Sequence, residues 1–169
     1  MIPDDLVIRK PELTDLYRVA MMHIEAWRDC YAGMVPQNYL DELDPITWMH
    51  EYRRLMDIGR TMLLAESAGT PVGVAIFGSR TLGIGHVEID ALYIARDRQG
   101  DGIGPRLLHE VLGYQEYTTV SLECATDNQR GCRFWEASGF RFTGETGSYP
   151  IPGAEDLPTN RYIRDINGS

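Results

Sequence analysis

The clearest indication of a functional site in this 169-residue sequence is a glycine-rich loop. The loop contains Gly100, Gly102 and Gly104 and lies between a predicted strand and a predicted helix. A helix N-terminus presents unpaired backbone N–H groups and the positive end of the helix dipole, which together bind phosphate oxygens. Glycine adopts positive φ and lets a ligand approach the backbone closely. The loop therefore predicts a phosphate-binding site, the alternative being a glycine-rich turn without a ligand.

Three other ligand-binding motifs do not fit this region. The dinucleotide fingerprint G-x-G-x-x-G needs glycine at Pro105 or at Leu107, depending on where it starts. The Walker A motif needs a lysine beside the loop, and Lys10 is the only lysine in the chain. The helix after the loop contains a His-Glu pair that opens like the zinc motif HExxH, but Gly113 stands where the second histidine belongs. The sequence predicts no metal site.

Two carboxylates just before the loop, Glu88 and Asp90, are candidates for acid–base chemistry on a strand predicted over 86–95. Alternation along that strand predicts one face with His86, Glu88, Asp90, Leu92 and Ile94, and the other with Val87, Ile89, Ala91 and Tyr93. Two carboxylates roughly 7 Å apart on one face raise the pKa of one of them toward the range of a general base. His86 is a third candidate. The alternative is that the carboxylates are solvated or only attract a cationic substrate.

The apolar spacing predicts the elements that position these residues. A helix over 13–31 has apolar residues three and four apart, with Thr14 or Asp15 as its N-cap. Further helices are predicted over 45–56, after the glycine loop, and over 129–138. Strands are predicted over 7–9, 62–66, 72–78, 86–95, 118–124, 141–143 and 161–166. This mixed order predicts an α/β sandwich around a mixed sheet.

Composition limits the classes of partner. The length fits a single domain over residues 1–169, and the net charge of −9 argues against a nucleic-acid partner while agreeing with a cationic substrate. No apolar run approaches the ~20 residues of a membrane helix. The acidic N-terminus does not resemble a signal peptide, so a cytoplasmic location is expected. The three cysteines are expected to be reduced thiols.

The segment Gln99–Gly104, read as Q-x-x-G-x-G, resembles the coenzyme-binding signature of the GNAT acetyltransferases. Two further blocks are similar to the family in the expected order. They are Trp27–Gly33, similar to W-R-x-x-Y-x-G, and Asn128–Phe140, similar to N…FYE…GF. The resemblance spans about residues 7–144. It implies a GNAT fold, in which a mixed, mostly antiparallel sheet is flanked by helices and splayed at its fourth strand.

The resemblance implies acetyl-CoA as cosubstrate and no metal. It places the coenzyme on Leu92, Tyr93, Ile94, Arg98, Gln99, Gly100, Asp101, Gly102, Ile103, Gly104, Asn128 and Trp135. Trp27 and Tyr31 fall in the helical pair that walls the acceptor site. Glu88 lies at the offset from the loop where histone-type members have their general base, with Asp90 two residues on.

Trp135 departs from the family pattern, because relatives usually have a tyrosine there that protonates the departing thiolate. An indole N–H cannot act as an acid. The reference pKa of a thiol is ~8.5, so its anion leaves fairly well near neutral pH without a proton. We therefore expect a substitute such as Tyr149, a water molecule, or no general acid.

The implied function is acetyl transfer from acetyl-CoA to a primary amine by direct attack in a ternary complex. The acceptor is either a small-molecule amine or a protein N-terminus or lysine. A catalytically silent acyl-CoA-binding module is the alternative function, and a homodimer is compatible with the resemblance.

Overall fold

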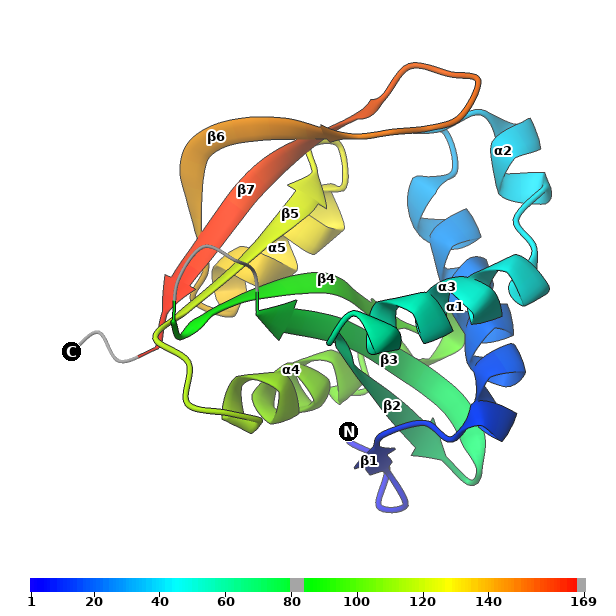
Figure 1. The fold of residues 1–169 in the computed structure, drawn as a ribbon, viewed down its shortest axis with the longest axis vertical. Helices are drawn as coiled ribbons and strands as arrows, with labels where there is room; N and C mark the ends of the chain where they lie inside the picture. Colours follow the sequence, from blue (N-terminus) through cyan, green and yellow to red (C-terminus); the bar gives the residue numbers. More distant parts are fainter. Residues whose placement is uncertain (80–83, 167–169) are drawn as a thin grey trace.

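The computed structural model describes residues 1–79 and 84–166 and contains a seven-stranded sheet in the order β1-β2-β3-β4-β5-β7-β6 (Figure 1). The strands are β1 (Val7–Arg9), β2 (Thr61–Ser67), β3 (Thr70–Ser79), β4 (His86–Ile94), β5 (Thr119–Ala125), β6 (Arg141–Tyr149) and β7 (Leu157–Asp165). The helices are α1 (Leu16–Tyr31), α2 (Gln37–Asp41), α3 (Pro45–Asp57), α4 (Ile103–Gly113) and α5 (Gln129–Ala137). Only β4 and β5 pair in parallel, so the sheet is mixed and mostly antiparallel, as predicted.

The helices cover both faces of the sheet, which confirms the predicted α/β class. On one face α1 and α3 pack on β2 and β3 through a cluster that includes Val19, Tyr52 and Leu64. On the other face α4 packs through Leu107 and Val111 on the central strands. Burial of these apolar stripes, rather than helix propensity, supplies most of the stability of such helices.

A β-bulge in β4 changes which side chains share a face. Ala91 pairs with Ile76 and Ile89 pairs with Phe77, so Asp90 is an extra residue in the ladder. The extra residue reverses the alternation of side chains beyond it. The predicted common face of Glu88, Leu92 and Ile94 is therefore wrong. Val87, Ile89, Leu92 and Ile94 belong to the cluster on the α4 side, whereas Ala91 and Tyr93 belong to the one on the α1 side.

Strands β4 and β5 are paired only over their first halves. The parallel ladder runs from His86 opposite Thr119 to Ile89 opposite Leu122, and the strands separate beyond it. This is the splay that the fold prediction placed at the fourth strand.

Several predicted boundaries need correction. Helix α1 begins at Leu16 after a 3-10 turn over Leu13–Asp15, and the Asp15 carboxylate accepts from the Glu12 N–H at 2.7 Å instead of capping α1. The β2–β3 connection is a two-residue turn, in which Ala68 and Gly69 have φ of 49° and 74°, as a type I′ hairpin requires. The strands predicted over 141–143 and 161–166 are both longer in the structure, where β6 and β7 form a long hairpin.

His23 is a buried histidine on α1, 5% exposed, whose Nδ1 lies 2.8 Å from the Tyr52 hydroxyl oxygen. Its ring packs edge-on to Trp48 at a centroid distance of 4.6 Å and lies 4.8 Å from the Tyr93 ring. Burial lowers the pKa of His23 to about 3. In the folded protein the His23 imidazole is therefore still neutral at about pH 6.5, where the same group gains a proton in the unfolded chain.

Acidification should consequently destabilise the protein through His23. The unfolded chain takes up a proton near pH 6.5 and the folded chain does not, so stability falls as pH drops from 6.5 toward 3. Between pH 8 and pH 5 the loss from this residue is about 2 kcal/mol. Urea unfolding of the native sequence and of His23→Gln at both pH values measures it, because glutamine keeps a partner for Tyr52 and does not titrate. An equal pH dependence in the two proteins would contradict the assignment.

Candidate active site

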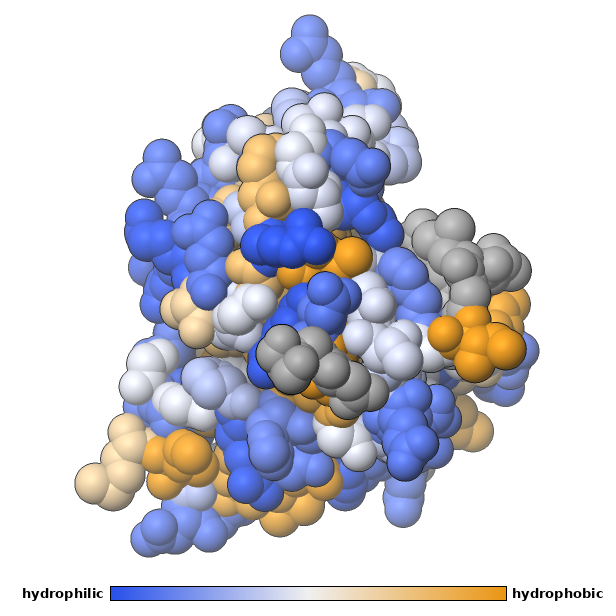
Figure 2. Space-filling view, turned by 90° about the vertical axis from the view of Figure 1, so that its left-hand side faces the viewer, coloured by the Kyte–Doolittle hydropathy of each residue, from blue (hydrophilic) through white to orange (hydrophobic). Residues whose placement is uncertain are grey.

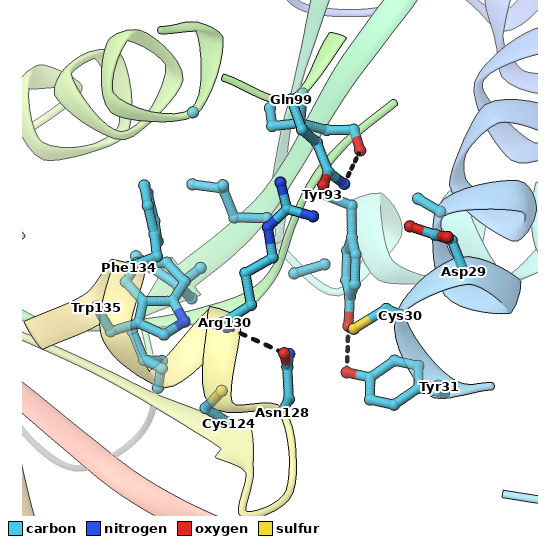
Figure 3. Close-up of a pocket in the computed structure, with 18 of the residues that line it drawn as sticks. Asp29, Cys30, Tyr31, Tyr93, Gln99, Cys124, Asn128, Arg130, Phe134 and Trp135 are labelled. Atoms are coloured by element: carbon cyan, nitrogen blue, oxygen red, sulfur yellow. Dashed lines mark hydrogen bonds between the residues drawn. The ribbon is translucent and has the colours of Figure 1, made fainter. Parts of the chain in front are cut away.

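A cavity of about 710 Å³ opens where β4 and β5 separate. Its walls come from the second half of β4, the loop before α4, the end of β5, the first turns of α5 and the C-terminal half of α1 (Figure 3). Segments from most of the chain thus converge where β4 and β5 no longer form backbone hydrogen bonds with each other.

The glycine loop forms one end of this cavity. Gly100 and Gly102 have φ of 90° and 80°, and Gly102 directly precedes the first residue of α4. A Cβ at Gly102 would lie 2.9 Å from Cγ1 of Ile2, so this position has neither the conformation nor the space for a side chain. The first N–H groups of α4 are left free of side-chain caps here, as an anion site at a helix N-terminus requires.

Gln99 and Arg98 occupy the edge of the loop. The Gln99 amide donates from Nε2 to the Ile94 carbonyl oxygen at 3.2 Å, while its Oε1 is buried and finds no partner among the described residues. Arg98 donates from Nε to the Asp101 carboxylate at 3.0 Å. A ligand with a hydrogen-bond donor would satisfy the Gln99 oxygen. A buried acceptor without a protein partner is therefore consistent with a ligand site at this loop.

Most of the predicted coenzyme residues line the cavity, and two do not. Those on its walls are Leu92, Tyr93, Ile94, Arg98, Gln99, Gly100, Gly102, Gly104, Asn128 and Trp135. Ile103 is 1% exposed and packs in the core beside Ala65 and Val72, because it is the first inward-facing residue of α4. Asp101 is not among the described residues that line the cavity, and its carboxylate pairs with Arg98.

Helix α5 contributes the opposite wall. The Asn128 side chain accepts from the Gly131 N–H at 3.0 Å and so caps the helix, leaving its amide N–H groups for a ligand. Trp135 is 7% exposed and packs against Phe140 at a centroid distance of 5.2 Å. Arg130, whose guanidinium has no ion pair among the described residues, extends from α5 toward Gln99 and Tyr93 in Figure 3.

The α1 end of the cavity is aromatic. The hydroxyl oxygens of Tyr31 and Tyr93 lie 2.7 Å apart, and burial raises the pKa of both, so both stay protonated. Trp27 does not appear in the described lining and stacks behind Tyr31 at a centroid distance of 4.4 Å. Tyr149, from the end of β6, lies 5.6 Å from the Trp27 ring. The tip of the long β6–β7 hairpin extends toward α2 and the end of α1 nearest to it (Figure 1).

The carboxylates near the cavity differ in burial and in partners. Glu88 is 2% exposed, accepts hydrogen bonds from Ser121 Oγ and from Arg161 Nη2, and is not among the described lining residues. Asp90, the bulge residue, does line the cavity and pairs with Arg60 at 3.0 Å. The structure therefore brings Asp90 to the cavity, whereas Glu88 is buried and precedes the first lining residue of β4, Ile89, in the chain.

Glu123 is a cavity residue that the sequence reasoning missed. It lies on β5 beyond the last residue paired with β4, and its side chain reaches the cavity. A Cβ at Gly147 would lie 2.8 Å from Glu123 Oε1, so the glycine on β6 leaves room for this carboxylate. The available signal was the single acidic residue of the strand, five residues before Asn128.

Comparison with known proteins agrees with this geometry. The model of the acetyltransferase (GNAT) family matches residues 21–140, a span that contains most of α1, the glycine loop and α5. The chain belongs to the GNAT acetyltransferase family. As a GNAT enzyme it takes its acetyl group from acetyl-CoA, which is a cosubstrate. The glycine loop, the second half of β4, which is unpaired on the β5 side, and the free Gln99 oxygen fit that group.

Two relatives of this GNAT chain come from Mycobacterium tuberculosis. One, named a probable N-acetyltransferase, is 34% identical over 157 residues and covers 90% of each chain. The other, the N-alpha-acetyltransferase RimI, is 34% identical over 101 residues, covering 57% of this chain and 63% of its own.

Solved GNAT structures share the fold at low identity. The PaiA N-acetyltransferase of Thermoplasma acidophilum, in complex with coenzyme A, has a TM-score of 0.73 at 18% identity, covering 95% of this chain and 98% of its own. YncA of Salmonella typhimurium, a structure with acetyl-CoA, has a TM-score of 0.72 at 18% identity, covering 98% and 96%.

Two further findings concern residues 1–79 and 84–166. Within them no three histidine, cysteine or acidic side chains are grouped so that they could hold a metal ion. No helix in that part of the chain has the length and apolar character needed to cross a membrane.

Proposed function

We propose that this enzyme transfers the acetyl group of acetyl-CoA directly to a primary amine while both are bound. The observation that carries the proposal is that one cavity joins the glycine loop to the Tyr31–Tyr93 end, so donor and acceptor can meet within it. The acceptor is a small-molecule amine or a protein N-terminus or lysine. An acidic cavity wall with Asp90 and Glu123, on a chain of net charge −9, favours an amine that arrives as a cation.

Direct transfer is favoured over an acetylated enzyme because the cavity thiols are poor nucleophiles. Burial raises the pKa of Cys30 to about 11 and also raises that of Cys124. A thiolate is the reactive form of cysteine, so both thiols are largely unreactive near neutral pH. The backbone of β4 at Leu92–Ile94, unpaired on the side of β5, is available to hold the pantetheine arm and orient the thioester.

The amine must lose a proton to attack, and we assign that proton to Glu88. Its carboxylate is buried and does not line the cavity, so in this proposal bridging water relays the amine proton to it. In this proposal Asp90 and Glu123 attract the cationic acceptor, and Trp27 and Tyr31 shape its pocket.

Trp135 has no acidic proton, so Tyr149 is the candidate acid for the departing thiolate. Burial raises the pKa of Tyr149, which keeps its hydroxyl protonated. The tip of the β6–β7 hairpin would carry it over the acceptor side, where it already contacts Trp27.

Initial-rate kinetics test the proposal. Release of free coenzyme A thiol is measured with a panel of diamines, amino-acid amides and short peptides, varying acetyl-CoA at several acceptor concentrations. We expect intersecting double-reciprocal lines with at least one acceptor, as a ternary complex requires. Parallel lines together with an acetylated cysteine in the intact-protein mass spectrum would overturn direct transfer. Coenzyme binding without turnover on any acceptor would favour a silent binding module.

A further inference from the structure

A chain of hydrogen bonds connects the buried Glu88 to the half-buried ring of His86. Ser121 on β5 lies opposite Glu88 in the parallel ladder, and its hydroxyl donates to Glu88 Oε2. The Nε2 atom of His86 lies 2.7 Å from the same Ser121 oxygen. Ser121 is 0% exposed, so these contacts with protein groups replace contact with water.

The hydrogen atoms of this chain can be counted. Ser121 has one hydroxyl hydrogen, which goes to Glu88, so its oxygen accepts from its other neighbours. Arg161 Nη2 donates to Ser121 Oγ at 3.0 Å and to Glu88 Oε2 at 3.3 Å, and His86 Nε2 donates the remaining bond. The chain is thus complete from carboxylate to imidazole, and Arg161 holds both oxygens in place.

We propose that this chain is the proton outlet of the active site, with His86 as its end at the solvent. The inference rests on the proposed function, in which Glu88 takes the amine proton. The C–N bond then forms and the C–S bond breaks, with its electron pair going to sulfur. Each turn begins when the half-buried imidazole exchanges its proton through water and changes from the Nε2–H to the Nδ1–H form. Protonated Glu88 then donates to Ser121, whose own hydrogen passes to Nε2 of His86. The imidazolium loses its Nδ1 proton to water, which returns the chain to its starting hydrogen bonds.

The burial of Glu88 creates the need for such an outlet. A carboxylic acid that is 2% exposed exchanges slowly with bulk water unless a polar group links it to the surface. Imidazole, with a reference pKa of ~6.5, both accepts and releases protons near neutral pH. β4 begins at the end of the molecule that faces the viewer in Figure 2, and most of that surface is hydrophilic. The charged groups that bond to this chain are Glu88 and Arg161, and Arg161 in turn has Glu145 at 3.9 Å and Glu123 opposite it in the β5–β7 ladder.

Chemical rescue tests the outlet. His86→Ala should lower kcat by roughly tenfold, less than loss of a direct base, with little change in KM for either substrate. Added imidazole should restore much of the rate, with the acetylated amine quantified by mass spectrometry against blanks without enzyme. His109→Ala, which removes an exposed histidine on α4, should keep the native rate and show no response to imidazole.

Two further variants separate a proton outlet from a structural contact. Ser121→Ala should lower kcat similarly and should not respond to imidazole, because the link to Glu88 is gone. His86→Gln keeps a hydrogen-bond donor for Ser121 but exchanges no proton, so it should be as slow as His86→Ala. Native activity in His86→Gln, or a His86→Ala rate that imidazole does not raise, would overturn the outlet. If Glu88→Gln also kept full activity, the assignment of the base would be wrong.

Discussion

Gly102→Asp should abolish acetyl-CoA binding while leaving the protein folded. The substitution places a side chain where φ is 80° and where a Cβ would meet Ile2 at 2.9 Å. It also adds a negative charge at the helix N-terminus that is predicted to bind phosphate, so like charges repel within the site. Isothermal titration calorimetry on the folded variant measures the loss, which we expect to be at least about 10³-fold, or roughly 4 kcal/mol.

Gly59→Asp is the matched control, because Gly59 has φ of 93° and a Cβ there meets nothing within 4 Å. It carries the same backbone strain and the same new charge at a site away from the cavity lining. It should bind acetyl-CoA as the native protein does, at a similar cost in melting temperature. Gly102→Ala should bind with intermediate affinity, since it adds the side chain without the charge. If Gly102→Asp kept native affinity, the coenzyme would have to bind elsewhere.

Glu88→Gln should lower kcat/KM by roughly 10²–10⁴ at neutral pH, because it keeps the shape of the side chain and removes the base. The loss should shrink at high pH, where the free amine forms without help. Rates between pH 6.5 and 9.5 with one acceptor measure both effects, and binding of acetyl-CoA should be unchanged.

Glu145→Gln is the control for Glu88, since Glu145 also faces Arg161 but its side chain is 74% exposed. It should change kcat/KM by less than about twofold, as exposed ion pairs contribute little. Glu123→Gln and Asp90→Asn test the carboxylates of the cavity wall, and we expect each mainly to raise the KM of the amine. A small loss in Glu88→Gln beside a large fall of kcat in Glu123→Gln would move the base to Glu123.

The local features of this protein were predictable from its sequence. The strand over His86–Ile94, the glycine loop and helix α3 over Pro45–Asp57 lie within a few residues of their predicted bounds. Each depends on a periodicity or a turn residue that acts within about ten positions of the chain. The family match over residues 21–140 depends on the same kind of local signal.

The partners of the candidate catalytic groups were decided by tertiary structure. Glu88 meets Arg161 from 73 positions away, and Tyr31 meets Tyr93 from 62. No local pattern encodes such pairs, because they depend on β7 being placed beside β5 and on α1 being folded over β4. The same is true of Glu123, whose exposure to the cavity follows from the end of the β4–β5 ladder.

The β4 bulge shows the limit most clearly. Alternation placed Glu88 with Leu92 and Ile94, and one extra residue at Asp90 put it on the opposite face. A strand of nine residues contains no sign of which position will be left out of the ladder, since that depends on how β3 fits against it. The sequence by itself determined the family, the glycine loop and the order of elements. The tertiary structure decided which face each carboxylate occupies, because side-chain direction in a sheet is set by pairing with neighbouring strands.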